Sequence, residues 1–151
     1  MKYSLRCVTS CVRSNKGLSA LLANPNTTVS LLDTIVCIGD IEMIANSAKI
    51  LRIMLTESKV KDQLTRKHPN LGNILVERLD LFKVSEVVII EILMAVKNFT
   101  KTPESAKLIN SNLLTHVVGM CLHPPNNKIQ NLAIELIQNL MVIESYHKKC
   151  L

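Results

Sequence analysis

Residues 85–100 read SEVVIIEILMAVKNFT and contain the apolar pattern that decides the fold of this chain. Apolar side chains recur three or four residues apart along this stretch, at Val88, Ile92, Ala95 and Phe99. That spacing places the four side chains on one face of an α-helix. The stretch therefore predicts an amphipathic helix whose apolar face is buried against other helices.

The same pattern occurs twice more, in residues 41–56 and in residues 126–141. The three stretches align without gaps at spacings of 44 and 41 residues. The matched apolar positions are Ile44, Val88 and Ile129; Ala48, Ile92 and Ala133; Leu51, Ala95 and Leu136; and Leu55, Phe99 and Leu140. A repeat of this length predicts helical units that stack on one another, because one unit alone cannot cover its apolar face.

A second set of helices is expected between these stretches, with aligned positions 39 and 43 residues apart. Its matched positions are Leu32, Leu71 and Leu114; Ile35, Ile74 and Val117; and Val36, Leu75 and Val118. Turn-forming residues separate the predicted helices, among them Pro25, Gly39, Pro69, Pro103 and Pro124. Proline inside a helix removes a hydrogen bond and clashes with the preceding turn, so these positions indicate helix ends.

Two of the predicted helices end in an aliphatic–x–Asn–aliphatic motif, Val96-Lys97-Asn98-Phe99 and Ile137-Gln138-Asn139-Leu140. With the repeat length, these endings resemble the armadillo repeat family. The chain departs from the family pattern at Met54, which replaces the Asn, and it lacks the paired Gly before the third helix. The resemblance implies an all-α, right-handed superhelix (an α-solenoid) of about three armadillo-like repeats. A HEAT-like solenoid stays open as the alternative.

We expect residues 1–151 to form a single armadillo-like helical repeat domain, incomplete at both ends. The first predicted helix, residues 5–13, fits the end of a repeat whose earlier helices we expect to be missing, and we expect no third helix after residues 132–143. Solenoids usually carry polar capping repeats at their ends. The pattern therefore indicates a fragment of a longer array, or self-association through the uncapped end helices.

The composition favours an intracellular protein, which we expect in the cytoplasm. Hydrophobic residues make up 48% of the chain, and neither a signal peptide nor a membrane-spanning run is apparent. The five cysteines stand among apolar neighbours, as is typical of buried thiols in a reducing compartment: Cys7, Cys11, Cys37, Cys121 and Cys150.

No motif of catalytic or metal-binding chemistry is present among the residues that could supply it. The four histidines form neither a zinc pattern nor a nucleophile–base pair, and there is no glycine-rich phosphate loop. His116 and Cys121 are five residues apart and so do not share a helix face well. We therefore expect a protein that is not an enzyme and uses no cofactor or metal.

The formal net charge of +6 is concentrated in part in the segment from Lys59 to His68, which we expect to be an exposed loop. Its basic patch consists of Lys59, Lys61, Arg66 and Lys67. The patch has three readings: a solvated polar loop, a surface for an acidic protein partner, or a contact with nucleic acid phosphates. The absence of Trp and the presence of only two Phe and two Tyr weaken the nucleic acid reading.

In armadillo proteins the third helices line a concave groove, and the resemblance implies that their polar positions face a partner. Those positions here are Asp33, Thr34, Asn73, Glu77, Arg78, Thr115, His116 and Met120. Asn73 could bond the backbone of an extended peptide. The Trp–Asn ladder of nuclear import receptors cannot exist without Trp. An ordinary solvated helix face is the alternative for each position.

The function expected from these patterns is a protein–protein interaction scaffold or adaptor that binds a peptide segment or folded partner through the concave face. The alternative is a nucleic-acid-associated basic α-solenoid that uses the Lys59–His68 loop. A third possibility is a segment that only extends a larger rod.

Overall fold

The computed structural model describes residues 2–24, 26–36, 40–81, 85–109 and 112–141. Within these ranges the regular structure is entirely helical. The helices are α1 (Lys2–Cys11), α2 (Asn15–Ala23), α3 (Asn26–Val36), α4 (Ile41–Met54), α5 (Ser58–Lys67), α6 (Leu71–Leu81), α7 (Glu86–Phe99), α8 (Pro103–Ala106), α9 (Asn112–Leu122) and α10 (Asn127–Met141). The predicted all-α class is confirmed.

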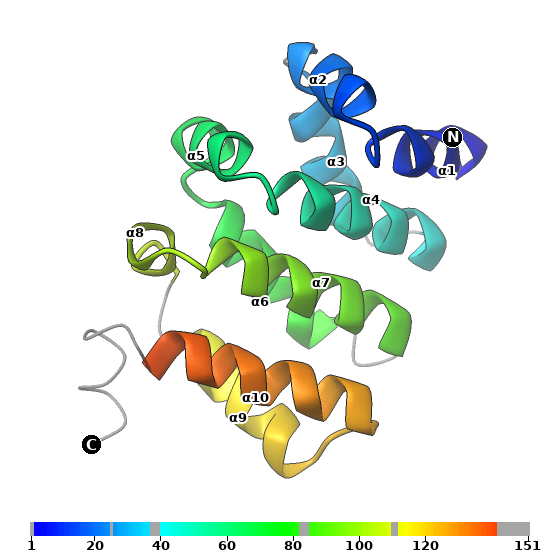
Figure 1. Ribbon diagram of the computed structural model, residues 1–151. Helices are drawn as coiled ribbons and strands as arrows, with labels where there is room; N and C mark the ends of the chain where they lie inside the picture. The colour runs from blue at the N-terminus through cyan, green and yellow to red at the C-terminus, as the bar shows by residue number, and fades with distance from the viewer. Residues whose placement is uncertain (1, 25, 37–39, 82–84, 110–111, 142–151) are drawn as a thin grey trace.

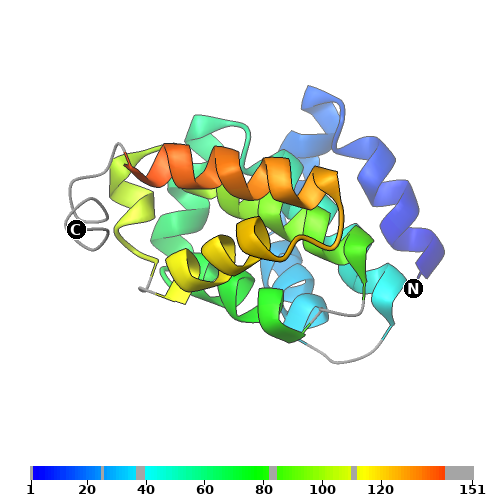
Figure 2. The same ribbon diagram turned by 90° about the horizontal axis from the view of Figure 1, so that it is seen from below.

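The helices stack in two rows. Helices α1, α4, α7 and α10 contact one another in succession, and α3, α6 and α9 form a second, less closely packed row behind them (Figure 1). Each helix of the second row packs on its neighbour in the first, which gives the pairs α3–α4, α6–α7 and α9–α10. Seen from below, α9 and α10 cover α6 and α7 (Figure 2).

The first row consists of the helices that the repeat predicted. The stretches 41–56, 85–100 and 126–141 fold as α4, α7 and α10. All twelve matched apolar positions are at most 1% exposed. The alignment therefore identified the buried face of each first-row helix correctly.

The second set of matched positions is only partly buried. Leu71, Ile35 and Val117 lie in the core, whereas Val36 and Val118 are 42% and 39% exposed. Leu75, which is aligned with them, is fully buried. The matched positions of this set therefore do not share one degree of burial.

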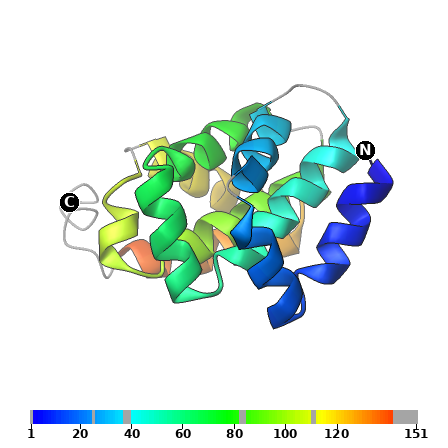
Figure 3. The same cartoon turned by 90° about the horizontal axis from the view of Figure 1, so that it is seen from above.

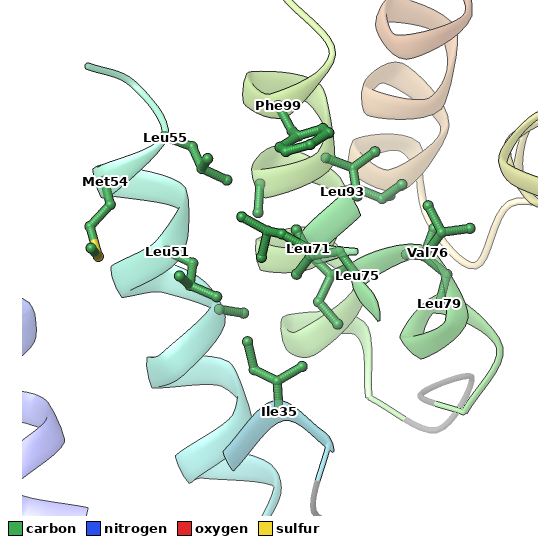
Figure 4. Packing of buried hydrophobic residues seen from close by; sticks show 14 of the residues in the cluster. Ile35, Leu51, Met54, Leu55, Leu71, Leu75, Val76, Leu79, Leu93 and Phe99 are labelled. Atoms are coloured by element: carbon green, nitrogen blue, oxygen red, sulfur yellow. The ribbon is translucent and has the colours of Figure 1, made fainter. Parts of the chain in front are cut away.

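The core is a continuous aliphatic layer between the two rows. Leu51 and Leu55 of α4 point toward Leu71 of α6 and Phe99 of α7, while Met54 points to the opposite side of α4 (Figure 4). Gly72 lets α6 approach closely at this point. A Cβ added there would lie 2.7 Å from Ile109 Cγ1 and 2.8 Å from Phe99 Cε1, so only glycine fits without displacement.

Polar contacts between successive first-row helices fix their register. Arg52 of α4 pairs with Glu91 of α7, and Lys97 of α7 pairs with Glu135 of α10. The buried Asn98 donates from Nδ2 to the Arg52 carbonyl, 3.0 Å away. That carbonyl lies in the last turn of α4, where helical carbonyls lack a partner within the helix. Asn98 of the predicted motif is thus a C-terminal cap supplied by the next helix.

Two expectations about local structure are wrong. The segment from Lys59 to Lys67 is not a loop but most of helix α5, which is followed at His68 by a turn. Of the cysteines, Cys7 and Cys11 are exposed on α1 and Cys121 is half-buried, so none of these three is a core residue. Cys37 and Cys150 lie outside the described residues.

Helices α1 to α3 form the near end of the stack when it is seen from above (Figure 3).

Candidate partner-binding site

The residues predicted to line a groove lie on the second row, on α3, α6 and α9. Asp33, Glu77 and Thr115 are exposed, whereas the others are half-buried: Thr34, Asn73, Arg78, His116 and Met120. The structure brings three of them together. Thr115, His116 and Met120 line one cavity.

This cavity, called the α9 cavity below, has a volume of about 530 Å³ and lies between α6, α7 and α9. Besides the three predicted residues it is lined by Leu79, Ile89, Gly119, His123 and Pro125. Its lining is mainly apolar, with the hydroxyl of Thr115 and two imidazoles as the polar groups. Cavities of this size and character are common ligand and side-chain binding sites, with volumes of roughly 300–1,000 Å³.

Helix α9 contributes most of the wall because one of its faces is turned toward the cavity. His116, Gly119, Met120 and His123 follow the three- and four-residue spacing of a single helix face. Gly119 also lines the cavity, and a Cβ added there would meet no atom within 4 Å. Glycine inside a helix is less favourable than alanine, so Gly119 lowers the stability of α9.

The far wall is held in place by the turn between α9 and α10. Pro124 and Pro125 prevent α9 from continuing, and Asn126 then caps α10 by accepting from Ile129 N at 2.9 Å. Asn126 Nδ2 also donates to Glu86 Oε2 at 2.7 Å, which ties the turn to the first turn of α7. His123 and Pro125 are therefore fixed relative to Ile89.

The other predicted groove residues lie outside this cavity. Asn73 Nδ2 donates to the Leu108 carbonyl at 3.3 Å, so part of its amide already joins α6 to the segment after α8. Thr34 donates to the Ser30 carbonyl of its own helix at 2.7 Å. The Arg78 Nε is buried and makes no hydrogen bond within the part of the chain that the structure describes.

The predicted basic patch is smaller than its sequence indicates. Lys59, Arg66 and Lys67 are exposed on α5, but Lys61 is only 4% exposed. Its Nζ donates to Thr102 Oγ1 at 3.1 Å, and burial lowers the pKa of this ammonium below its usual value. Including Lys61 in an exposed patch was wrong, because helix formation turns this side chain toward α8.

Sequence reasoning missed five residues of the α9 cavity. Leu79 and Ile89 look like core residues, and His123 and Pro125 look like turn residues. The one available signal was Gly119, a glycine inside a helical pattern, which indicates a packing or functional reason for its small size. Among the described residues no group of three or more His, Cys, Asp or Glu side chains is placed to hold a metal ion.

None of the described helices is both long and apolar enough to cross a bilayer.

No protein-family model matches the sequence, and no curated protein matches it either.

Proposed function

We propose that this chain is a non-enzymatic protein–protein interaction module that binds a peptide segment or a folded partner through the α9 cavity. The observation that carries the proposal is the meeting of Thr115, His116 and Met120 in one mainly apolar cavity. The resemblance to armadillo repeats implied that these three residues face a partner.

The chemistry of the cavity suits a large apolar side chain of a partner. Leu79, Ile89 and Met120 supply apolar contact area, and methionine adapts its shape to different occupants. Interfaces are dominated by a few such side chains buried in pockets. The thioether and the two imidazole rings also favour an aromatic occupant.

The surface next to the cavity extends the apolar area. Leu122 is 68% exposed and Val118 is 39% exposed, and both lie on α9 beside the wall formed by Thr115 and Gly119. Thr115, Val118, Gly119 and Leu122 follow the spacing of one helix stripe. A partner anchored in the cavity would cover this stripe as well.

We also propose that the two rows of helices are part of an armadillo-like α-solenoid. The support is the recurrence of the first-row helices and their buried positions at spacings near 40 residues, with a matching second row. Such an array holds its helices rigid before binding, so little ordering entropy is lost when a partner docks.

The experiment that tests the binding site uses two substitutions of the same residue. Gly119→Phe adds a large side chain at a residue that lines the cavity, where a Cβ meets no atom, so it is expected to obstruct the cavity without deleting a contact. Gly119→Ala leaves the cavity almost unchanged and is the matched control. Wild-type and variant proteins are used to capture partners from cell extract, and each partner is then purified and its affinity measured by calorimetry.

The proposal expects a partner whose Kd rises at least about tenfold with Gly119→Phe and stays unchanged with Gly119→Ala. Circular dichroism of both variants establishes that the fold is intact. Partners that bind wild type and Gly119→Phe equally well would show that the α9 cavity is not the binding site.

A further inference from the structure

A second cavity lies between α5 and α8 and has a polar lining. It has a volume of about 610 Å³ and is called the α5 cavity below. The hydroxyls of Ser58, Thr65 and Thr102 line it, together with both positive and negative side chains. This lining differs from that of the α9 cavity, so a different chemistry is expected of its occupant.

The most informative group in the α5 cavity is the ammonium of Lys61. The side chain is 4% exposed, and its Nζ has a single hydrogen bond, to Thr102 Oγ1. An ammonium carries three donors, and the bond to Thr102 uses one of them. Within the residues that the structure describes, no carboxylate forms an ion pair with Lys61.

A buried charge with one neutral partner is energetically costly. Charged groups taken out of water require a counter-charge or several hydrogen bonds to offset their lost hydration. Burial is the main reason that the pKa of Lys61 is lowered, and the charges of Asp62 and Glu104 oppose it only in part. An anion in the cavity would accept from this ammonium and offset part of the cost of its burial.

The charges around the cavity limit which anion fits. Lys61 and Arg66 are the lining cations, and Asp62 and Glu104 are the lining anions. Because the lining cations and anions balance, a bound carboxylate leaves a net charge near −1 and a phosphate leaves one near −2, which costs more in a partly buried site. The rim includes Leu108, which is 41% exposed and can contact an apolar part of the occupant.

We propose that the α5 cavity binds a single carboxylate of an acidic peptide segment, with Lys61 Nζ as the buried cation and Arg66 as the cation at the rim. Ser58, the first residue of α5, also lines the cavity, so the first turn of this helix lies beside the site.

This inference goes beyond the proposed function, because it concerns a different cavity and a different chemical class of partner group. The two are tested separately. Substitutions at Gly119 leave the α5 cavity intact, and substitutions at Lys61 leave the α9 cavity intact.

The test is a titration of the ¹⁵N-labelled full chain with acetyl-glutamate amide, a probe that carries one carboxylate. We expect saturable shifts of the backbone amide signals of α5 and α8. Acetyl-glutamine amide, which has the same shape without the charge, should cause no such shifts. Equal shifts with both probes, or no shifts with either, would overturn the proposal.

Variants then assign the effect to Lys61. Lys61→Met should raise the Kd of acetyl-glutamate amide about tenfold or more, because a charge-assisted hydrogen bond is lost. Lys59→Met on the same helix removes an exposed charge and should leave the Kd unchanged. A fall in affinity of the same size in both variants would overturn the role of Lys61.

Arg66→Gln changes an exposed residue that lines the cavity, so it keeps the fold and gives a second readout if Lys61→Met does not fold. It should weaken binding of the probe severalfold, whereas unchanged binding would contradict the site. Inorganic phosphate is titrated in parallel. Tighter binding of phosphate than of acetyl-glutamate amide would overturn the carboxylate assignment.

Discussion

Arg52 Nε lies 2.7 Å from Glu91 Oε2, so a hydrogen-bonded ion pair joins α4 to α7 across 39 positions of sequence. The side chains are only 21% and 17% exposed. The next step of the row, from α7 to α10, is joined by Lys97 and Glu135, whose side chains are more exposed at 31% and 49%. The same type of contact thus occurs twice in different surroundings.

A double-mutant cycle with Arg52→Met and Glu91→Gln should give a coupling free energy of about 1–2 kcal/mol, because the pair is largely shielded from water. The same cycle with Lys97→Met and Glu135→Gln should give about 0.2–1 kcal/mol, as exposed ion pairs do. Urea denaturation measures both. A larger coupling for the exposed pair would contradict the assigned role of burial.

Alanine at two of the helical glycines, Gly72 and Gly119, should have opposite effects on stability. Gly119→Ala should stabilise the fold by about 0.5–1 kcal/mol, because the added Cβ meets no atom and alanine favours the helix. Gly72→Ala should destabilise it by about 1–3 kcal/mol, since Phe99 and Ile109 must move. Thermal and urea unfolding give both values. Stabilisation by Gly72→Ala would show that α6 and α7 are not closely packed there.

The two asparagines of the repeated motif should differ in importance. Asn98→Ala should cost about 1–3 kcal/mol, because Asn98 caps the Arg52 carbonyl from a buried position. Asn139→Ala should change stability by less than about 0.5 kcal/mol. The equivalent carbonyl, that of Val96, is already satisfied by the backbone N–H and hydroxyl of Thr100. Equal losses of stability for Asn98→Ala and Asn139→Ala in urea denaturation would contradict this distinction.

Stability should depend on pH through Lys61. Its folded-state pKa is lowered by burial, with Lys101 acting in the same direction and Asp62 and Glu104 opposing. Between that lowered pKa and the ordinary value of 10.5, the unfolded chain binds more protons than the folded one, so this contribution to stability rises with pH. Burial of the charged ammonium destabilises the fold fully at pH values below the folded-state pKa and no longer destabilises it above pH 10.5.

The free energy of unfolding of wild type, relative to that of Lys61→Met, should therefore increase as pH rises from 7 to 11. Urea denaturation at several pH values measures it. Lys59→Met is the control, and its difference from wild type should stay constant. A constant difference for Lys61→Met as well would show that the ammonium is not desolvated.

The cysteines should react at different rates with an alkylating reagent in the folded state. Cys7 and Cys11 are exposed, whereas Cys121 is half-buried and burial raises the pKa of its thiol. Less thiolate and less access both slow alkylation. Timed reaction with iodoacetamide and peptide mass spectrometry should find Cys121 the slowest of these three. Rates that equalise only in denaturant would support the assignment, and faster reaction of Cys121 in the fold would contradict it.

The sequence predicted the first row of helices well because its buried residues repeat in register. Positions such as Leu51, Ala95 and Leu136 each face two neighbours, so an apolar side chain is required at all of them. The helices of the second row pack less closely against one another, and the row includes exposed valines such as Val36 and Val118. Periodicity alone cannot separate those positions from the core.

The candidate sites were only partly predictable, because they depend on contacts between distant segments. The burial of Lys61 requires Thr102, 41 residues away, and a charge pattern cannot reveal that contact. The α9 cavity likewise requires the turn at Asn126 to be held by Glu86. Thr115, His116 and Met120 were found because they lie on one helix that the resemblance placed along a groove, whereas Leu79 and Ile89 come from other helices.

The central claim, that a partner docks over α9, is tested most directly by site-specific photo-crosslinking. Benzoylphenylalanine is placed at Leu122, beside the cavity, and in a control protein at Val29, an exposed residue of α3. Irradiation in cell extract should join a protein partner to position 122 and not to position 29, and Gly119→Phe should abolish the product. Crosslinks of equal yield from both positions, or crosslinks at 122 that survive Gly119→Phe, would contradict the claim.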